Sequence, residues 1–263
     1  MTIHRIVAKI TFITLAFFIF ATSASASECK TLTATGNSEY PPYLWQPSTH
    51  SKHLTGAINF IIDELSLRLK RNITLKHVGA WSRAQEEVKS GRVDIMAGAF
   101  YTAPRSQWMD YVYPAFLSTN SVVWQHQDKL LNYAGKQSLV GKLGVTVINN
   151  SFGQKFDDFA KRNLHIEFVA SLEQAFKMLR LKRVDYVLYE ENPGLSYAYQ
   201  MGIAEDIVHL TPPISSEGLY LAISHKSKCN TGKLRGAMAK IIGEMIEDGF
   251  MNKALKMGLA LRD

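Results

Sequence analysis

The stretch Thr-Ala-Pro-Arg at residues 102–105 combines residue types that bind a carboxylate. Thr102 suits a helix N-cap and Pro104 suits the first helical turn, so Arg105 is predicted at a helix N-terminus. The stretch follows a predicted strand at residues 93–97, and open α/β sheets bind ligands beyond the carboxyl ends of their strands. Helix N–H groups and a guanidinium would together hold an anion there. The alternative is an ordinary surface arginine.

Aromatic and acidic side chains follow other predicted strands at the same edge. Tyr40 and Trp81 each come after a strand and would form walls on which a ligand stacks. Glu190 and Glu191 end a strand of the second half, and one of them would pair with a ligand ammonium opposite Arg105. The alternatives are aromatic side chains that only pack the interior and an acid that is solvated at the start of a helix.

The sequence contains none of the common catalytic or metal-binding motifs. It has no Gly-x-Ser-x-Gly, no phosphate-binding glycine loop with Lys-Ser or Lys-Thr, and no His-Glu-x-x-His. His50 and His53 lie three residues apart, but in a loop rich in proline and serine. We therefore expect no metal, no cofactor and no enzymatic activity.

Strands and helices alternate along the chain and would position these residues. Apolar runs predict strands at residues 31–35, 73–78, 93–97, 143–148, 166–169 and 184–189. Ser82 with Gln85, and Ser171 with Gln174, have the spacing of capping boxes that open helices between these strands. This order is typical of a mostly parallel sheet covered by helices, which is an α/β fold.

The two halves of this pattern resemble each other. Residues 92–94 and 183–185 both read Arg-Val-Asp, and each triplet follows a capped helix and opens an apolar strand. Two α/β lobes of similar plan would produce this repetition, although two βαβ units can also be alike by chance.

The segments that connect the halves are less regular. Residues 122–124 look like a short strand, the prolines at residues 212–213 break the pattern, and residues 219–224 form another strand. The chain closes with an amphipathic helix from Leu234 to Met245 that Gly249 ends.

The N-terminus predicts export. Arg5 and Lys9 precede an apolar run at residues 10–20, and Ala-Ser-Ala at residues 24–26 is a cleavage signal. The run is too short to span a bilayer, although a retained anchor is the alternative. Removing Arg5 and Lys9 lowers the net charge from +7 to +5, and the remaining basic residues form no stripe. This charge fits an anionic or zwitterionic ligand and gives no indication of nucleic acid.

Cys29 and Cys229 are the two cysteines of the chain. In an oxidising compartment they would pair and tie the mature N-terminus to a segment near the C-terminus. The alternative is two separate buried thiols.

Taken in order, these motifs resemble the bacterial extracellular solute-binding proteins of family 3, the amino-acid-binding periplasmic proteins of ABC transporters. The resemblance implies the type II periplasmic-binding-protein fold, in which each of two lobes is a mostly parallel sheet flanked by helices and two crossovers form a hinge. It covers essentially the whole mature chain. The residues that carry it are Tyr40-Pro41-Pro42-Tyr43, Gly56, Trp81, Gly91-Arg92-Val93-Asp94, Thr102-x-x-Arg105, Asp110-Tyr111-Val112-Tyr113-Pro114, Val184-Asp185 and residues 219–256.

The resemblance also implies roles for individual residues. Arg105 would clamp a ligand α-carboxylate, and Glu190 would take its α-ammonium. Further ligand contacts are expected from Tyr40, Trp81, Thr102, Gly98, Phe100, Asn150 and Ser151. Family members often have small hydroxyl residues where Ala97, Gly98 and Phe100 stand here. Backbone groups would have to serve instead, and this more apolar site puts a standard polar amino acid in doubt.

The expected organisation is a signal peptide at residues 1–26, a first lobe at 27–121 and 215–263, and a second lobe at 122–214. The expected function is a monomeric periplasmic protein that captures an amino acid or similar small carboxylate between the lobes for an ABC permease. One alternative is a periplasmic cyclohexadienyl (arogenate or prephenate) dehydratase in which Glu190 is the acid. Another is a sensor that signals to a separate partner.

Overall fold

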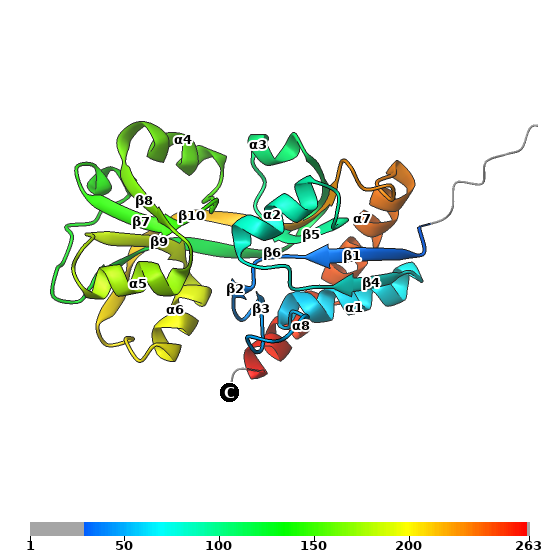
Figure 1. Ribbon diagram of the computed structural model, residues 1–263, viewed down its shortest axis with the longest axis horizontal. Helices are drawn as coiled ribbons and strands as arrows, with labels where there is room; N and C mark the ends of the chain where they lie inside the picture. The colour runs from blue at the N-terminus through cyan, green and yellow to red at the C-terminus, as the bar shows by residue number, and fades with distance from the viewer. Residues whose placement is uncertain (1–28, 262–263) are drawn as a thin grey trace, which may run out of the picture.

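The computed structural model describes residues 29–261, so the predicted signal peptide lies outside the described residues. One eight-stranded sheet runs through the molecule in the order β4-β1-β5-β10-β6-β9-β7-β8 (Figure 1). Its strands are β1 (Thr31–Thr35), β4 (Asn72–Leu75), β5 (Ile95–Ala99), β6 (Met109–His126), β7 (Leu143–Val147), β8 (His165–Val169), β9 (Tyr186–Glu190) and β10 (Ile207–Ser224). A short hairpin adds β2 (Glu39–Tyr40) and β3 (Leu44–Trp45).

Two groups of parallel strands make up most of this sheet. In one, β1 pairs in parallel with β4 and β5, and in the other β7 pairs in parallel with β8 and β9. The antiparallel strands β6 and β10 join the groups. The predicted α/β class with a mostly parallel sheet is therefore confirmed, but the two groups form one continuous sheet.

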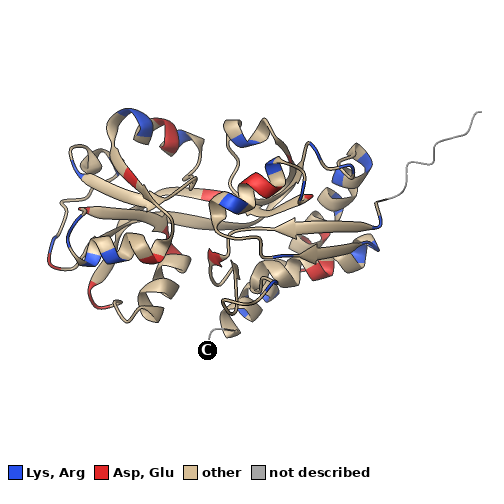
Figure 2. Cartoon of the chain, viewed as in Figure 1, with Lys and Arg blue, Asp and Glu red and all other residues tan. Residues whose placement is uncertain are grey.

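Helices cover each group of strands. Figure 1 places α4, α5 and α6 around β7 to β9, and α1, α2, α3, α7 and α8 around β1, β4 and β5. Their bounds are α1 (Ala57–Leu69), α2 (Trp81–Lys89), α3 (Ala103–Ser106), α4 (Gln154–Asn163), α5 (Leu172–Arg180), α6 (Glu191–Gln200), α7 (Gly232–Glu247) and α8 (Phe250–Ala260), with a 3-10 turn at Lys136–Leu139. No bilayer-spanning helix occurs within residues 29–261. Basic and acidic residues are scattered over both groups (Figure 2).

The helix starts follow the predicted caps at two places and not at a third. The hydroxyls of Thr102 and Ser171 accept N–H bonds at the starts of α3 and α5, as their spacing predicts. The prediction for Ser82 is wrong, because α2 already begins at Trp81 and its N-cap, Ala80, makes no side-chain bond. At the C-terminus Gly249 ends the predicted helix, but α8 then follows, so two helices stand where one was predicted.

The two connecting strands are longer than predicted. The expected strands at residues 122–124 and 219–224 are the ends of β6 and β10, each of which has 18 residues. Pro212 and Pro213 do not end the strand. They lie where the register between β10 and β6 shifts, between Leu210 and Ser215, so no ladder hydrogen bond is required of them.

The repeated Arg-Val-Asp triplet makes the same backbone contact in both groups. Asp94 accepts from the N–H of Thr33 at 2.8 Å, and Asp185 accepts from the N–H of Leu143 at 2.8 Å. Each carboxylate thus links the segment just before β5 or β9 to the neighbouring parallel strand, β1 or β7. The sequence repetition therefore corresponds to the same local contact in both groups of strands.

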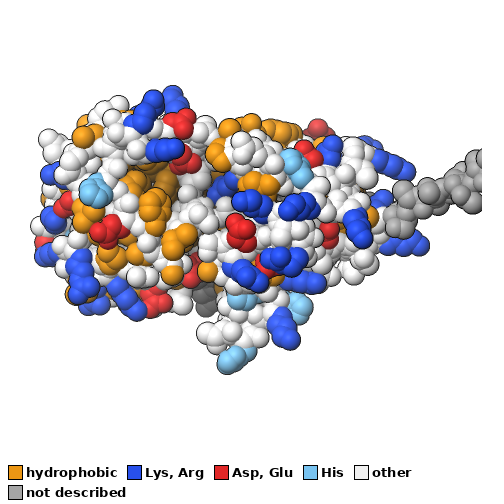
Figure 3. All heavy atoms as spheres, turned by 45° about the horizontal axis from the view of Figure 1, so that its top comes forward, with side chains coloured by type: hydrophobic (Ala, Val, Ile, Leu, Met, Phe, Trp, Pro, Cys, Tyr) orange, Lys and Arg blue, Asp and Glu red, His pale blue; other side chains and the backbone are white. Residues whose placement is uncertain are grey.

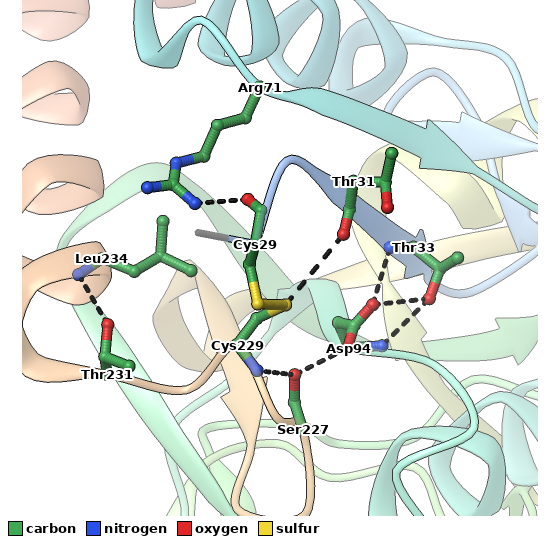
Figure 4. The surroundings of a disulfide bond; sticks show 9 residues. All are labelled: Cys29, Thr31, Thr33, Arg71, Asp94, Ser227, Cys229, Thr231 and Leu234. Atoms are coloured by element: carbon green, nitrogen blue, oxygen red, sulfur yellow. Dashed lines mark hydrogen bonds between the residues drawn. A yellow bond between two sulfur atoms is a disulfide. The ribbon is translucent and has the colours of Figure 1, made fainter. Parts of the chain in front are cut away.

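A disulfide joins Cys29 to Cys229, with 5.5 Å between their Cα atoms (Figure 4). It connects the start of β1 to the segment before α7, which places both ends of the described chain in the same group. The Ser227 hydroxyl beside it donates to Asp94 at 2.6 Å. The same carboxylate therefore supports both β1 and the disulfide segment.

Candidate ligand-binding site

A pocket between the two groups of elements collects nearly all of the predicted site residues. It has a cavity volume of about 20 Å³ and lies beyond the carboxyl ends of β1, β5, β7 and β9. This position matches the rule for ligand sites in open α/β sheets. Its lining residues are Asn37, Tyr40, Trp81, Gly98, Ala99, Phe100, Arg105, Asn150, Ser151, Glu190 and Leu219.

Arg105 is buried at one side of this pocket, with 7% of its surface exposed. Its guanidinium donates to the carbonyl of Phe100 and to that of Asn149, each at 3.2 Å, and lies over the Trp81 ring at 5.4 Å. It forms no ion pair with any residue between 29 and 261, so three of its five N–H donors remain for a ligand. Burial lowers the pKa of Arg105 from its ordinary value.

Glu190 ends β9 on the opposite side and is 1% exposed. Its Oε2 atom has no hydrogen-bond partner among the described residues. Burial raises the pKa of this carboxyl from its ordinary value of 4.5 to about 7, and the charge of Arg105 partly opposes that rise. Glu191 instead bonds Asn120 at 3.2 Å and does not line the pocket, so Glu190 is the acid that faces the candidate site.

Tyr40 and Trp81 form aromatic sides of the pocket. Tyr40 packs against Tyr43 and Tyr189, with ring centroids 5.2 and 6.5 Å away, and its hydroxyl has no partner among residues 29–261. The Trp81 indole N–H donates to the carbonyl of Asn149 at 3.2 Å. These rings are therefore fixed by packing and by an interlobe hydrogen bond.

Unpartnered polar atoms surround the pocket. The hydroxyl of Tyr40, the amide nitrogen of Asn150 and a carboxylate oxygen of Glu190 line it without a well-formed hydrogen bond in the described chain. Thr119 lies close enough to Tyr40, and Asn150 to Glu190, to lower the pKa of each by hydrogen bonding, although burial raises both pKa values overall. The hydroxyls of Thr119 and Ser121 on β6 are also buried and unpartnered, and Ser121 pairs in register with Glu190. Buried polar groups nearly always have partners, so this concentration indicates a polar ligand.

Gly98 brings backbone close to the pocket at the end of β5. Its φ angle of +93° belongs to the left-handed region, and an added Cβ would lie 2.8 Å from the Ile58 side chain. A larger residue at this position would therefore be strained, and the backbone faces the pocket in place of a side chain.

The structure differs from the predicted site at its edges. Thr102 does not line the pocket; it caps α3 and lines an adjoining depression. Sequence reasoning missed Asn37, Ala99 and Leu219, which line the pocket, and the Asn149 carbonyl beside it. Asn37 comes two residues after β1 and could have been found by the rule that identified Tyr40. Leu219 carries no such signal, because its strand was predicted only from apolar residues.

The adjoining depression lies between α2 and α3 on one side and α4 on the other, with a cavity volume of about 390 Å³. Figure 3 turns forward the face that holds α3 and α4, and charged side chains of both signs lie on it. Arg105, Asn150 and Ser151 line both the pocket and the depression.

Comparisons with known proteins agree with this geometry. The family model for bacterial extracellular solute-binding proteins, family 3, matches residues 32–257. A comparison with curated proteins gives no match. The matched family is described as one of solute-binding proteins, so the comparison does not favour the dehydratase alternative.

Solved structures share the fold at low sequence identity. An ancestral arginine-binding protein bound to arginine has a TM-score of 0.73 at 18% identity, over 88% of this chain and 98% of its own. A substrate-binding protein of an amino acid ABC transporter from Streptococcus pneumoniae, bound to L-arginine, has 0.71 at 18% identity, over 89% and 96%. A histidine kinase sensor domain similar to periplasmic binding proteins has 0.73 at 18% identity, over 88% and 97%. The fold is thus the predicted type II periplasmic-binding-protein fold.

Proposed function

This chain belongs to the bacterial extracellular solute-binding proteins of family 3, and from that premise we propose that it captures an amino acid or similar small carboxylate between two lobes. The observation that carries the proposal is the Arg105 guanidinium, which is buried beside a pocket and pairs with no carboxylate of the described chain. The carboxyl groups of Asp157 and Glu190 act on this charge only from beyond ion-pair distance. A buried charge without an ion-pair partner is costly, so an anionic ligand would relieve that cost.

The proposed binding mode uses both sides of the pocket. The ligand carboxylate accepts from the remaining N–H groups of Arg105, and the ligand ammonium lies against Glu190. The unpartnered atoms of Tyr40 and Asn150 supply further hydrogen bonds. Closure around the ligand excludes water and strengthens these contacts.

The proposed lobes are residues 27–121 with 215–263, and residues 122–214. At these boundaries only β6 and β10 connect the two groups of elements (Figure 1). The proposal places the protein in the periplasm after cleavage of residues 1–26, as a monomer whose closed form an ABC permease recognises.

Calorimetric titration of Arg105→Ala tests this function, after a thermal-shift screen has identified an amino acid that binds. Loss of a charged hydrogen bond costs about 1.5–3 kcal/mol, so affinity should fall at least about tenfold. Arg105→Lys, which keeps the charge but not the bidentate geometry, should be intermediate. Arg83→Ala on α2 is the matched control, since Arg83 pairs with Glu87 outside the pocket. Equal affinity of the Arg105→Ala and unaltered proteins would refute the proposed mode.

A sensor that passes its closed state to a separate partner is the second candidate, favoured by the likeness to a histidine kinase sensor domain. Uptake of the radiolabelled ligand separates the two candidates. Deletion of the gene should abolish high-affinity uptake if the protein feeds a permease. Unchanged uptake with a lost transcriptional response would favour the sensor.

A further inference from the structure

A row of hydrogen bonds separates the pocket from the larger depression beside it. The carbonyl of Asn149, in the loop after β7, accepts from the Trp81 indole at 3.2 Å, the Gln85 amide at 3.1 Å and the Arg105 guanidinium at 3.2 Å. Trp81 lines only the pocket, whereas Gln85 and Asn149 line only the depression. These bonds therefore lie along the boundary between the two spaces, and we refer to them as the Asn149 clasp.

The backbone conformation of Asn149 is unusual and suits this contact. Its φ angle of +60° is in the left-handed region, where asparagine is tolerated better than most residues with a side chain. Its carbonyl thereby receives three donors from α2 and α3 of the opposite lobe. A carbonyl has two lone pairs, so this one is fully used.

Charge is distributed differently on the two sides of the Asn149 clasp. Within the pocket, Arg105 and Glu190 are the two charged side chains of its lining. The depression adds Glu86, Lys89, Asp157, Asp158 and Lys161. Once the carboxylate and ammonium of an amino acid have paired with Arg105 and Glu190, the pocket offers no partner for a third ligand charge. An unpaired charge in such a buried site is strongly unfavourable.

The pocket is also small. Its cavity volume of about 20 Å³ is room for about one or two water molecules, because a water needs roughly 10–15 Å³ by this measure. A long side chain therefore finds no room in the pocket itself and would have to extend past the Asn149 clasp and break its hydrogen bonds.

We infer that the pocket selects amino acids with short, uncharged side chains, and that Trp81 and Gln85 set this limit through their bonds to the Asn149 carbonyl. The inference rests on the proposed function and adds a ligand class to it. Trp81 and Gln85 act as specificity-determining residues: their bonds close the route by which a long side chain would reach the charged depression.

Titration calorimetry with two sets of probes tests the inference. Against the unaltered protein, at least one of L-alanine, L-serine and L-valine should bind at least tenfold more tightly than L-arginine, L-lysine and L-glutamate. The double variant Trp81→Phe/Gln85→Ala removes two donors to Asn149 while keeping an aromatic ring. In this variant, the ratio of the affinity for the best short probe to that for L-arginine or L-lysine should be at least tenfold smaller than in the unaltered protein.

Gln154→Ala is the matched control. This glutamine also forms an interlobe bond beside the depression, to the N–H of Ala103 at 3.0 Å, but does not contact Asn149. The Gln154→Ala variant should have the same ratio of affinities for short and long probes as the unaltered protein. Because the double variant must be folded for the comparison, circular dichroism and a melting curve accompany each titration, and Gln85→Ala alone serves if the double variant does not fold.

The outcomes distinguish this inference from the proposed function. If L-arginine or L-lysine binds the unaltered protein as tightly as the short probes, and Arg105→Ala abolishes that binding, the inference fails while the function stands. An unchanged affinity ratio in the folded Trp81→Phe/Gln85→Ala variant, or in Gln85→Ala where that replaces it, also overturns the inference. If none of the six probes binds, the inference fails; the proposed function is rejected as well only if the thermal-shift screen of amino acids and small carboxylates gives no ligand.

Discussion

At the scale of single residues, the candidate site depends on side chains that the fold buries without giving them partners. Glu190 and Tyr40 have oxygen atoms without a hydrogen-bond partner at the pocket, and Arg105 forms no ion pair with a described residue, although the charges of Asp157 and Glu190 act on it from a greater distance. Leaving a buried polar atom unpaired costs about 1–3 kcal/mol. Stability alone would select against such a group, so a ligand role explains it better than a structural role.

The pH dependence of affinity should identify the charge state of Glu190. Its pKa of about 7 in the free protein means that it is half protonated near neutral pH. A ligand ammonium favours the ionised form and lowers that pKa, so binding releases a proton. Affinity should rise as pH increases from 5.5 to about 7 and then level off. Calorimetry at several pH values measures this slope.

Variants at Glu190 and its neighbour provide the comparison. Glu190→Gln cannot ionise, so its affinity should be lower and independent of pH across that range. Glu191→Gln should retain the slope, since Glu191 lies outside the pocket. Affinity that falls as pH rises would mean that Glu190 binds the ligand as a neutral acid, against the ammonium contact proposed above.

Tyr40→Phe should separate binding from stability. The Tyr40 hydroxyl is buried and bonds no described residue, so its removal should leave the melting temperature unchanged or raise it. If the ligand bonds that hydroxyl, affinity should fall about two- to tenfold, since a hydrogen bond contributes about 0.5–1.5 kcal/mol. Tyr43→Phe is the control: its hydroxyl accepts from Asn192 at 2.8 Å, so stability should fall instead. Unchanged affinity in Tyr40→Phe would exclude this ligand contact.

At the scale of secondary structure, each group of strands is held by an aspartate at the start of the segment that leads into β5 or β9. Asp94 accepts three hydrogen bonds, from the N–H and hydroxyl of Thr33 and from the hydroxyl of Ser227. Asp185 accepts from the N–H of Leu143 and from Lys129. These carboxylates lie at the ends of the strands away from the pocket.

Asp94→Ala should therefore lower stability without altering ligand contacts. Loss of charged hydrogen bonds should reduce the free energy of unfolding by at least about 2 kcal/mol, measured by urea denaturation. Asp128→Ala removes an exposed pair with Lys182 and should leave the free energy of unfolding nearly unchanged. Equal costs for the two variants would contradict the structural role of Asp94.

At the scale of the whole molecule, two interlobe contact regions flank the pocket. On one side the Asn149 carbonyl receives donors from α2 and α3. On the other, Glu39 of β2 accepts from the N–H of Leu172 in the first turn of α5 at 3.3 Å, where a helix favours negative charge. Both contacts join elements that are connected only through β6 and β10, so they can form or break as the lobes move.

The disulfide affects the whole molecule because the loop that it closes contains most of the chain. Cys29 and Cys229 are 200 residues apart, and closing so long a loop restricts the unfolded state. The double variant Cys29→Ser/Cys229→Ser should lose about 2–5 kcal/mol of stability, measured by denaturant unfolding. Ligand affinity should stay within about twofold, since the pair lies away from the pocket. Loss of binding in the folded double variant would show that the disulfide also positions the site.

The sequence alone determined the features that local chemistry encodes. Apolar runs located the parallel strands to within two residues at their starts, and the spacing of Thr102 and Arg105 placed a guanidinium at a capped helix start. The positions after strand ends then identified Tyr40, Trp81 and Glu190, because parallel strands bring their carboxyl ends to one edge. Each of these signals depends on a few neighbouring residues.

Only the tertiary structure decided which distant residues meet. The prolines of β10 appeared to end a strand, yet the strand continues because a register shift against β6 tolerates them. The choice between Glu190 and Glu191, the absence of Thr102 from the pocket and the role of the Asn149 carbonyl follow from how the two lobes close on each other. Such contacts are set by packing between segments far apart in the chain, and local sequence patterns do not record them.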